Sequence, residues 1–186
     1  AQFDLCGFTQ LASSRKPEEV VQFMSDLFGA FDKLTDKHGV YKVETVGDAY
    51  IAGVAERPLT EESMPVSVVL FGLDMVRAVD DWAKQLNVAV TCRVGIHSGE
   101  CIGGIVGSDM QRYHLFGDLL TVLEILESTA PEGRVQISSG CKAEVCRQLR
   151  DEEGVTRKRE EQLSFRQRED ATLETSKGEV HEYSKV

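Results

Sequence analysis

The chain has 186 residues, of which 41% are hydrophobic and 28% charged, and its formal net charge is −10. This composition is ordinary for one globular domain with a single core. The basic cluster at residues 157–159 is followed at once by Glu160 and Glu161, so nucleic-acid binding, which needs excess Lys and Arg, is disfavoured. No apolar run approaches the roughly 20 residues of a membrane span and no signal peptide is visible, so we expect no membrane contact from this segment.

The first half of the sequence predicts long helices that alternate with short strands. Apolar residues recur at helical spacing after Pro17, which suits a helix start, and Gly39 ends the segment. Two strand-like runs flank Gly47 and Asp48, which predicts a hairpin. The expected elements are a strand over 1–5, cut short as in a domain excised from a larger protein, a helix over 18–38, strands over 41–44 and 49–54, and a helix over 63–86.

The second half continues the alternation and ends in a charged tail. Residues 88–96 are rich in β-branched side chains, and 101–106 is expected to be their partner strand. A helix over 119–129, a strand over 134–138 and a helix over 141–150 follow. We expect 151–170 to form a charged loop or edge hairpin, and 173–186 to alternate like strands around Lys177 and Gly178. The order of elements predicts an α+β sandwich with a mostly antiparallel sheet.

Five cysteines occur without a CxxC pair: Cys6, Cys92, Cys101, Cys141 and Cys146. An odd number of cysteines without metal-ligand spacing predicts reduced cytosolic thiols that serve as packing residues.

Two aspartates lie where predicted strands end. Asp4 precedes a glycine turn into a helix, which places a carboxylate beside free backbone N–H groups and suits a metal-bound triphosphate. A strand-terminal Asp that satisfies a turn is the simpler interpretation of this segment alone. Asp48 is ordinary turn chemistry by itself. Two such aspartates on adjacent strands, however, can share one or two Mg²⁺ ions, which sit roughly 3.5–4 Å apart in two-metal sites.

A third segment surrounds Arg93, on a strand expected to flank the two aspartates. Its guanidinium suits a bidentate contact with phosphate oxygens. His97 is a base or a ligand in one interpretation, but no Cys or second His lies at ligand spacing, so a structural, hydrogen-bonded histidine is favoured. The glycines that follow lack both the GxGxxG and the GxxxxGK[ST] spacing, which excludes Rossmann and P-loop motifs.

Six linked motifs make the pattern specific: FDLCGFT (3–9), YKVETVGDAY (41–50), CRVGIHSGE (92–100), GGIVG (103–107), RYHLFGD (112–118) and EST (127–129). In order and spacing they resemble the catalytic domains of class III adenylyl and guanylyl cyclases over residues 3–138, with a weaker match at 177–183. Two of the motifs, at 41–50 and 112–118, are more similar to guanylyl cyclases. The resemblance implies an α+β, ferredoxin-like (βαββαβ) core with added C-terminal strands, as a single catalytic domain over 1–186.

In the family that the chain resembles, two domains pair head to tail and share each active site. The resemblance implies that Asp4, Asp48 and the Leu5 carbonyl hold two Mg²⁺ or Mn²⁺ ions. It also implies triphosphate contacts from Gly7, Phe8, Thr9 and Arg93, and more loosely from Lys177. Such a site converts GTP or ATP to the 3′,5′-cyclic monophosphate and pyrophosphate.

The complementary half of the site departs from the family pattern. The family has an Asn that orients the ribose and, four residues later, an Arg that stabilises charge on the α-phosphate; here Thr121 and Ile125 stand in their places. Losing a contact of that kind commonly costs about 2.7–4 kcal/mol, or 10²–10³ in rate. The pattern resembles the metal-donor subunit of heterodimeric cyclases, whose partner brings the Asn and Arg, and implies weak or no activity as a homodimer.

The base-selecting positions are mixed. Glu44 is a carboxylate, as in guanylyl cyclases, whereas His114 stands where guanylyl cyclases usually have Cys and adenylyl cyclases Asp. Gln2 replaces an expected apolar residue, which leaves the packing of the first strand open.

Three hypotheses follow. The first is a cytoplasmic cyclase subunit that binds GTP, less readily ATP, and needs a homologous partner. The second is a catalytically silent domain that serves dimerisation or regulation. The third, a plain ferredoxin-like binding module, gives no reason for the pair of aspartates.

Overall fold

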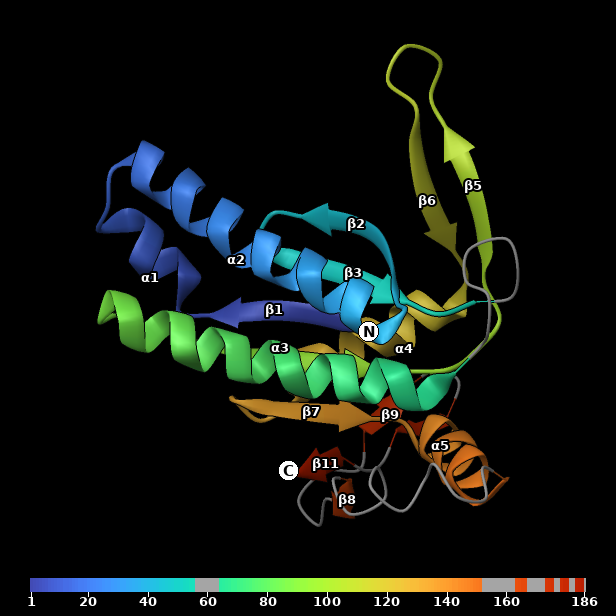
Figure 1. Ribbon diagram of the computed structural model, residues 1–186. Helices are drawn as coiled ribbons and strands as arrows, with labels where there is room; N and C mark the ends of the chain where they lie inside the picture. Colours follow the sequence, from blue (N-terminus) through green and yellow to red (C-terminus); the bar gives the residue numbers. More distant parts are fainter. Residues whose placement is uncertain (56–63, 152–162, 167–172, 176–177, 181–182, 186) are drawn as a thin grey trace.

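A seven-stranded sheet runs through the protein in the order β2-β3-β1-β4-β7-β11-β8 (Figure 1). The computed structural model describes residues 1–55, 64–151, 163–166, 173–175, 178–180 and 183–185. Its helices are α1 (Phe8–Ser13), α2 (Pro17–His38), α3 (Pro65–Leu86), α4 (Asp118–Thr129) and α5 (Ser139–Asp151). Its strands are β1 (Gln2–Cys6), β2 (Tyr41–Val46), β3 (Ala49–Gly53), β4 (Thr91–Ile96), β5 (Ile102–Val106), β6 (Arg112–Phe116), β7 (Arg134–Ile137), β8 (Ser164–Arg166), β9 (Leu173–Thr175), β10 (Gly178–Val180) and β11 (Tyr183–Lys185).

The predicted ferredoxin-like core is confirmed. The strands β2-β3-β1-β4 are all paired antiparallel, with α2 and α3 as the two connecting helices. Beyond them β4 pairs with β7 in parallel, and β11 and β8 add the C-terminal strands. The sheet is therefore mostly antiparallel, as expected.

The two faces of the sheet are covered by different helices, and β4 shows how its side chains divide. A Cβ on Gly72 of α3 would lie 3.1 Å from Ile96 and 3.3 Å from Val94, so these residues face α3. A Cβ on Gly95, between them, would lie 2.5 Å from the backbone N of Glu127, so Gly95 faces α4. Because strand side chains alternate between faces, Arg93 shares the α4 face with Gly95.

The main core lies under α2 and α3. It is centred on aromatic rings from the sheet and both helices: Phe3, Phe31, Tyr50 and Phe71, each with no exposed surface. Helix α2 forms at the predicted place because Pro17 opens it, the Glu19 carboxylate accepts a hydrogen bond from the Lys16 N–H (3.0 Å), and left-handed Gly39 (φ 63°) ends it. The burial of these rings holds β1 and β3 side by side.

The side chains of β1, whose packing was uncertain from the sequence because of Gln2, also alternate between the two faces of the sheet. Phe3 and Leu5 are buried on the α2–α3 side. Gln2 alternates with them, and its amide lies 3.5 Å from a Glu127 carboxylate oxygen of α4. The polar side chain of Gln2 is accommodated on this face because it lies next to the buried carboxylate of Glu127.

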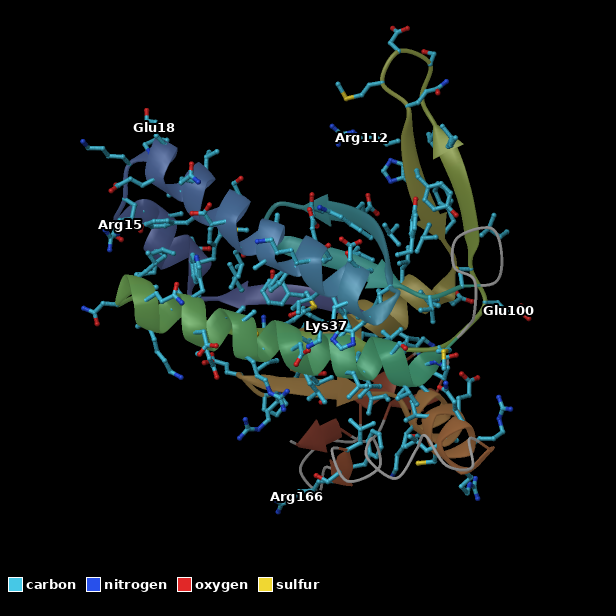
Figure 2. The ribbon with its side chains drawn as sticks, viewed as in Figure 1. Arg15, Glu18, Lys37, Glu100, Arg112 and Arg166 are labelled. Carbon is cyan, nitrogen blue, oxygen red and sulfur yellow. The ribbon has the colours of Figure 1, made fainter. Side chains whose placement is uncertain are left out.

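One predicted strand pairing is wrong. Residues 101–106 were expected to pair with the strand that ends at Ile96, but β5 pairs with β6, a strand that sequence reasoning missed. The reason is that both edges of β4 are taken, one by β1 and the other by β7. After β4 the chain leaves the sheet and forms the separate β5–β6 hairpin, called the arm below, which projects from the body (Figures 1 and 2).

The strand predicted over 88–96 begins only at Thr91. Helix α3 ends at Leu86 with a left-handed residue, Asn87 (φ 53°), and the Val88 N–H donates to the Ala83 carbonyl at 3.0 Å. The residues before Thr91 are thus used to end the helix.

The C-terminal tail is described in parts. Within 151–170, residues 164–166 form β8, the outermost strand of the sheet. The strand-like alternation expected after 173 appears as the β9–β10 pair and β11. Lys177 lies outside the described residues.

All five cysteines have free thiols. Cys92 and Cys141 are buried packing residues as predicted, whereas Cys101 is exposed, so the packing interpretation is wrong for that residue. Among the residues that the structure describes, no helix has the length and apolarity required to cross a membrane.

Candidate active half-site

Asp4 and Asp48 come together through strand pairing. The β1–β3 register sets Phe3 opposite Tyr50, so Asp4 and the hairpin turn with Asp48 lie just beyond that pair. Burial raises the pKa of Asp48, and the negative charge of Asp4 raises it further. Two carboxylates that repel one another in this way favour a bound cation between them.

Arg93 lies directly beside the aspartates, because β1 and β4 pair Asp4 with Arg93. One guanidinium nitrogen, Nη2, is 3.5 Å from the Asp4 carboxylate, and Nη1 donates to the Ser128 carbonyl at 2.9 Å. Nε is 3.3 Å from Oε1 of Glu127. Asp4, Asp48 and Arg93, called the metal group below, therefore form one cluster, as the sequence predicted.

Glu127 is the first residue of the EST motif, but no role in the site was predicted for it. Only 6% of this residue is exposed, although it is acidic. The pKa of Glu127 is raised to about 7, mainly because the carboxyl group is buried. The negative charge of Asp4 raises this pKa further, whereas the positive charge of Arg93 lowers it. One sequence signal was available: Glu127 falls on the buried stripe of α4 with Leu123 and Leu126, at helical spacing.

The turn between β1 and α1 carries three predicted phosphate contacts. Gly7 adopts a left-handed conformation (φ 85°), and its Cβ would lie 3.3 Å from the Ala89 carbonyl oxygen, so another residue would be strained there. Phe8 and Thr9 follow as the first residues of α1. The turn leads directly from the strand that carries Asp4.

Glu44 and His114 form a separate cluster, called the base group below. Oε2 of Glu44 on β2 is 3.2 Å from Nδ1 of His114 on β6. The contact fixes the foot of the arm against β2, together with the rings of Tyr41 and Tyr113, whose centroids are 6.5 Å apart. The two predicted base-selecting residues are therefore neighbours in space, although 70 residues separate them in the sequence.

Thr121 and Ile125 lie on α4, one turn apart. Thr121 is exposed and Ile125 half-buried. No contact joins either of them to the metal group among the described residues; the α4 partners of that group are Glu127 and Ser128. The exposed face of α4 is thus apolar or weakly polar where the family pattern has an amide and a guanidinium.

His97 has the hydrogen bond that the structural interpretation requires, because its Nδ1 is 2.8 Å from the Ser138 hydroxyl. Burial lowers the pKa of His97. Next to it, Ser98 donates to the Glu144 carboxylate at 2.7 Å. These contacts tie the segment after β4 to α5 and away from the metal group.

A groove of about 1080 Å³ opens between the arm, the β2–β3 hairpin and the start of α4. Its lining includes Val43, Ile51, Tyr113, Leu115 and Leu119. Neither the metal group nor the base group lines it. Polar side chains such as His97, Glu100 and Glu144 line it as well, and it is separate from both clusters.

The donor set of the metal group fits Mg²⁺ or Mn²⁺. Within the described part of the chain, no group of three or more His, Cys, Asp and Glu side chains is placed to hold a metal ion. Mg²⁺ does not need such a cage, because it is usually held by one or two carboxylates, with water and substrate phosphates as the other ligands. Asp4 and Asp48 offer two carboxylates, and the charge of Asp4 raises the pKa of Asp48, which matches that requirement.

Structural comparison gives the fold. The guanylate cyclase domain of RhGC from Catenaria anguillulae, in complex with GTP, has a TM-score of 0.81 and 23% identity, covering 98% of this chain and 92% of that one. The adenylyl cyclase CyaB from P. aeruginosa has a TM-score of 0.80 and 20% identity, covering 98% and 90%. Both chains share the α+β architecture described above.

Sequence comparison gives the family. Human retinal guanylyl cyclase 1 is 36% identical over 137 residues, which is 73% of this chain and 12% of the relative. Guanylyl cyclase C of Rattus norvegicus is 36% identical over 138 residues, and the chain spans only 13% of its length. The sequence model of the adenylate and guanylate cyclase catalytic domain matches residues 3–184. The chain belongs to the adenylate and guanylate cyclase catalytic domain family and is related to the guanylyl cyclases.

Proposed function

We propose that the chain is the metal-bearing half-site of a purine nucleotide cyclase that converts GTP, in preference to ATP, to the 3′,5′-cyclic monophosphate and pyrophosphate. The observation that carries the proposal is the metal group: two mutually repelling carboxylates, with the cation Arg93 3.5 Å from one of them. A plain binding module has no need of such an arrangement. Thus we set the third hypothesis aside.

Asp4, Asp48 and the Leu5 carbonyl are the groups that would hold two divalent ions. When bound, the ions neutralise phosphate charge and favour loss of the proton from the ribose 3′-hydroxyl. The 3′-oxygen then bonds to the α-phosphorus, the bond from that phosphorus to the bridging oxygen of the β-phosphate breaks, and pyrophosphate leaves. The hydroxyl proton passes to water.

Arg93 and the backbone amides of Gly7, Phe8 and Thr9 bind the triphosphate in this proposal, with Lys177 as a further contact. Arg93 points a charged donor group from β4 toward the aspartates, and a guanidinium is suited to phosphate oxygens by geometry as well as charge. Its role is to hold the β- and γ-phosphates and to stabilise the leaving pyrophosphate.

A partner domain must supply the Asn and Arg that Thr121 and Ile125 replace. Isoleucine cannot neutralise the charge that develops on the α-phosphate, so a homodimer is weakly active or inactive. The arm supports assembly with a second cyclase domain in a head-to-tail dimer, because large apolar side chains are exposed along it: Ile102, Ile105, Val106, Met110 and Phe116.

In a shared site the partner domain supplies the base-reading residues, so the base group indicates the family branch and would read the purine only where this chain forms the complementary half. The carboxylate of Glu44 can accept hydrogen bonds from guanine N1–H and the 2-amino group, which adenine lacks in that arrangement. His114, 3.2 Å away, orients that carboxylate. We infer the preference for GTP from this resemblance to the guanylyl cyclase branch, with the partner's base-reading residues as the ones that select the base in the half-site.

The second candidate function is a catalytically silent domain that serves dimerisation or regulation. Thr121 and Ile125 are the observation that favours it, since they remove two catalytic groups from the chain. A larger cytoplasmic protein fits both candidates, because the chain spans about an eighth of its curated relatives.

A mixing experiment separates the two candidates. The chain is assayed with Mg²⁺ or Mn²⁺ and GTP or ATP, alone and with cyclase domains that carry the Asn and Arg but lack the aspartates. The half-site predicts cyclic nucleotide in a mixture and little from either protein alone. No product in any mixture in which sedimentation verifies the heterodimer would establish the silent alternative.

A further inference from the structure

Glu127 is a buried acid with no role in the half-site as proposed. It is 6% exposed and lies on the face of α4 that packs on the sheet. Taking a carboxylate out of water costs free energy unless it meets a cation and hydrogen-bond donors. An apolar residue would fill this position of the buried stripe at lower cost, so the acid requires an explanation.

The position of Glu127 is fixed by backbone packing. At Gly95, α4 touches β4 so closely that a Cβ would lie 2.5 Å from the Glu127 N and 2.8 Å from the Leu123 carbonyl oxygen. From β7, the buried amide of Gln136 donates to the Leu126 carbonyl at 3.1 Å. The end of α4 is thus held rigidly over β4, and the Glu127 carboxylate has little freedom to move away from Arg93.

The contact between the two side chains is incomplete. Nε of Arg93 and Oε1 of Glu127 are buried and 3.3 Å apart, yet within the described residues neither atom has a hydrogen-bond partner. The guanidinium is shared, because Nη2 also approaches Asp4 at 3.5 Å. A cation bound at Asp4 competes with Arg93 for that carboxylate, and its charge repels the guanidinium.

Within the described parts of the chain, the other anchors of Arg93 belong to α4. They are the Ser128 carbonyl, 2.9 Å from Nη1, and the Glu127 carboxylate. The second oxygen of Glu127 is held by the Gln2 amide at 3.5 Å, which leaves the first one turned toward Arg93. Released from Asp4, the guanidinium can settle on these anchors with its remaining N–H groups free for an anion.

We propose that Glu127 is a positioning residue, which holds the Arg93 guanidinium on α4 when a divalent cation occupies Asp4 and so presents it to the triphosphate. This inference rests on the proposed function, since it requires metal and triphosphate in the half-site. Gln2 contributes to the same positioning, because its amide orients the Glu127 carboxylate.

Equilibrium binding tests the proposal without turnover. The chain, mixed with the partner domain, is titrated with 3′-deoxy-GTP and with 3′-deoxy-GMP in the presence of Mn²⁺. The variants are Glu127→Gln, Arg93→Ala, the double variant and Gln2→Leu. Glu132→Gln is the matched control, because Glu132 is an exposed acid on the loop after α4 that accepts a hydrogen bond from the Thr91 hydroxyl at 3.2 Å.

The expected pattern is selective for the triphosphate. Glu127→Gln should weaken 3′-deoxy-GTP binding roughly 10-fold and Gln2→Leu about 3-fold, in line with one charged and one weaker hydrogen bond. Binding of 3′-deoxy-GMP should not change. In the Arg93→Ala background, Glu127→Gln should cause no further loss, because the group that it positions is gone. The control should bind as the unmodified chain does.

Each other outcome overturns a stated claim. Equal triphosphate binding by the unmodified chain and by Glu127→Gln overturns the positioning role alone. Additive losses in the double variant do the same, as does a matching loss of 3′-deoxy-GMP binding, which would indicate a structural defect. If Glu127→Gln does not fold, unchanged binding by Gln2→Leu overturns the role. Absence of triphosphate binding by the unmodified chain overturns the proposed function, and the positioning role with it.

Discussion

The metal group contacts one end of α4, and Thr121 and Ile125 lie on the same helix. The two regions differ in how many of the family's functional side chains they keep. Asp4, Asp48 and Arg93 are together, with charge contacts among them. Thr121 and Ile125 carry no charge at the places where the family pattern has an amide and a guanidinium. Both regions therefore keep the fold, and only the side chains of Thr121 and Ile125 depart from the family pattern.

The largest effect is expected from removing one carboxylate of the metal group. In an active mixture, Asp48→Asn should lower kcat by at least about 10³, because the cations lose one of two protein carboxylates. The same change should raise the melting temperature slightly without metal, since burial and Asp4 both disfavour the Asp48 charge. Initial rates and thermal melts measure the two effects.

Asp26→Asn serves as the control, since Asp26 is exposed on α2 and contacts Gln22. Turnover retained by Asp48→Asn would show that the metal assignment is wrong.

A smaller change, a gain in activity, is expected from restoring the Asn and Arg of the family pattern. Thr121→Asn combined with Ile125→Arg should raise the activity of the chain alone by about 10²–10³, since both contacts act in the transition state. Cyclic nucleotide formed by the double variant, without partner, is the measurement. Asp48→Asn in the same background should return it to baseline; if it does not, the product does not arise from the metal group.

The base group should shift selectivity by a smaller factor. In that restored homodimer, Glu44→Lys with His114→Asp should change the ratio of kcat/KM for GTP over ATP by about 10–10² in favour of ATP, since guanine loses its acceptor. The pair is changed together because the two side chains are in contact. An unchanged ratio, with activity preserved, would remove Glu44 and His114 from base recognition.

The smallest expected effect is the dependence of the free energy of unfolding on pH, through Glu127 of α4. The folded-state pKa of Glu127 is about 7, above its ordinary value of 4.5. A raised carboxyl pKa contributes stability that is present below pH 4.5 and is lost as pH rises through 7. Glu127→Gln should therefore flatten this decline, by about 1–2 kcal/mol between pH 4.5 and 7.5 without metal. Urea unfolding at both pH values measures it, and parallel curves for the two proteins would contradict the assignment.

Much of this architecture was predictable because burial follows local periodicity. The helices around Phe31 and Phe71 and the hairpin that carries Asp48 form where apolar spacing and glycine turns place them. The arm was not, because Ile102, Ile105 and Phe116 are apolar yet exposed. Pattern reasoning assigns such residues to the nearest sheet, and it gives no sign that both edges of β4 are occupied.

The metal group was predictable from motifs, but the partner of Arg93 was not. An acid in a helix usually belongs to its solvated face, and only the position of Glu127 on the stripe of Leu123 and Leu126 indicates burial. The contact with Gln2 depends on how closely α4 approaches β4. That approach is a property of the assembled sheet, which spacing along the chain does not reveal.

The contact at Gly95 also makes a single body of α4 and β4. Because Gly95 has no side chain, the backbone of the helix packs directly on the backbone of the strand. Helix α4 is 12 residues, or about 18 Å, long. Thr121 near one end of α4 and Arg93 on β4 beneath the other end therefore belong to one closely packed unit, so a partner that contacts Thr121 contacts the same unit that carries Arg93.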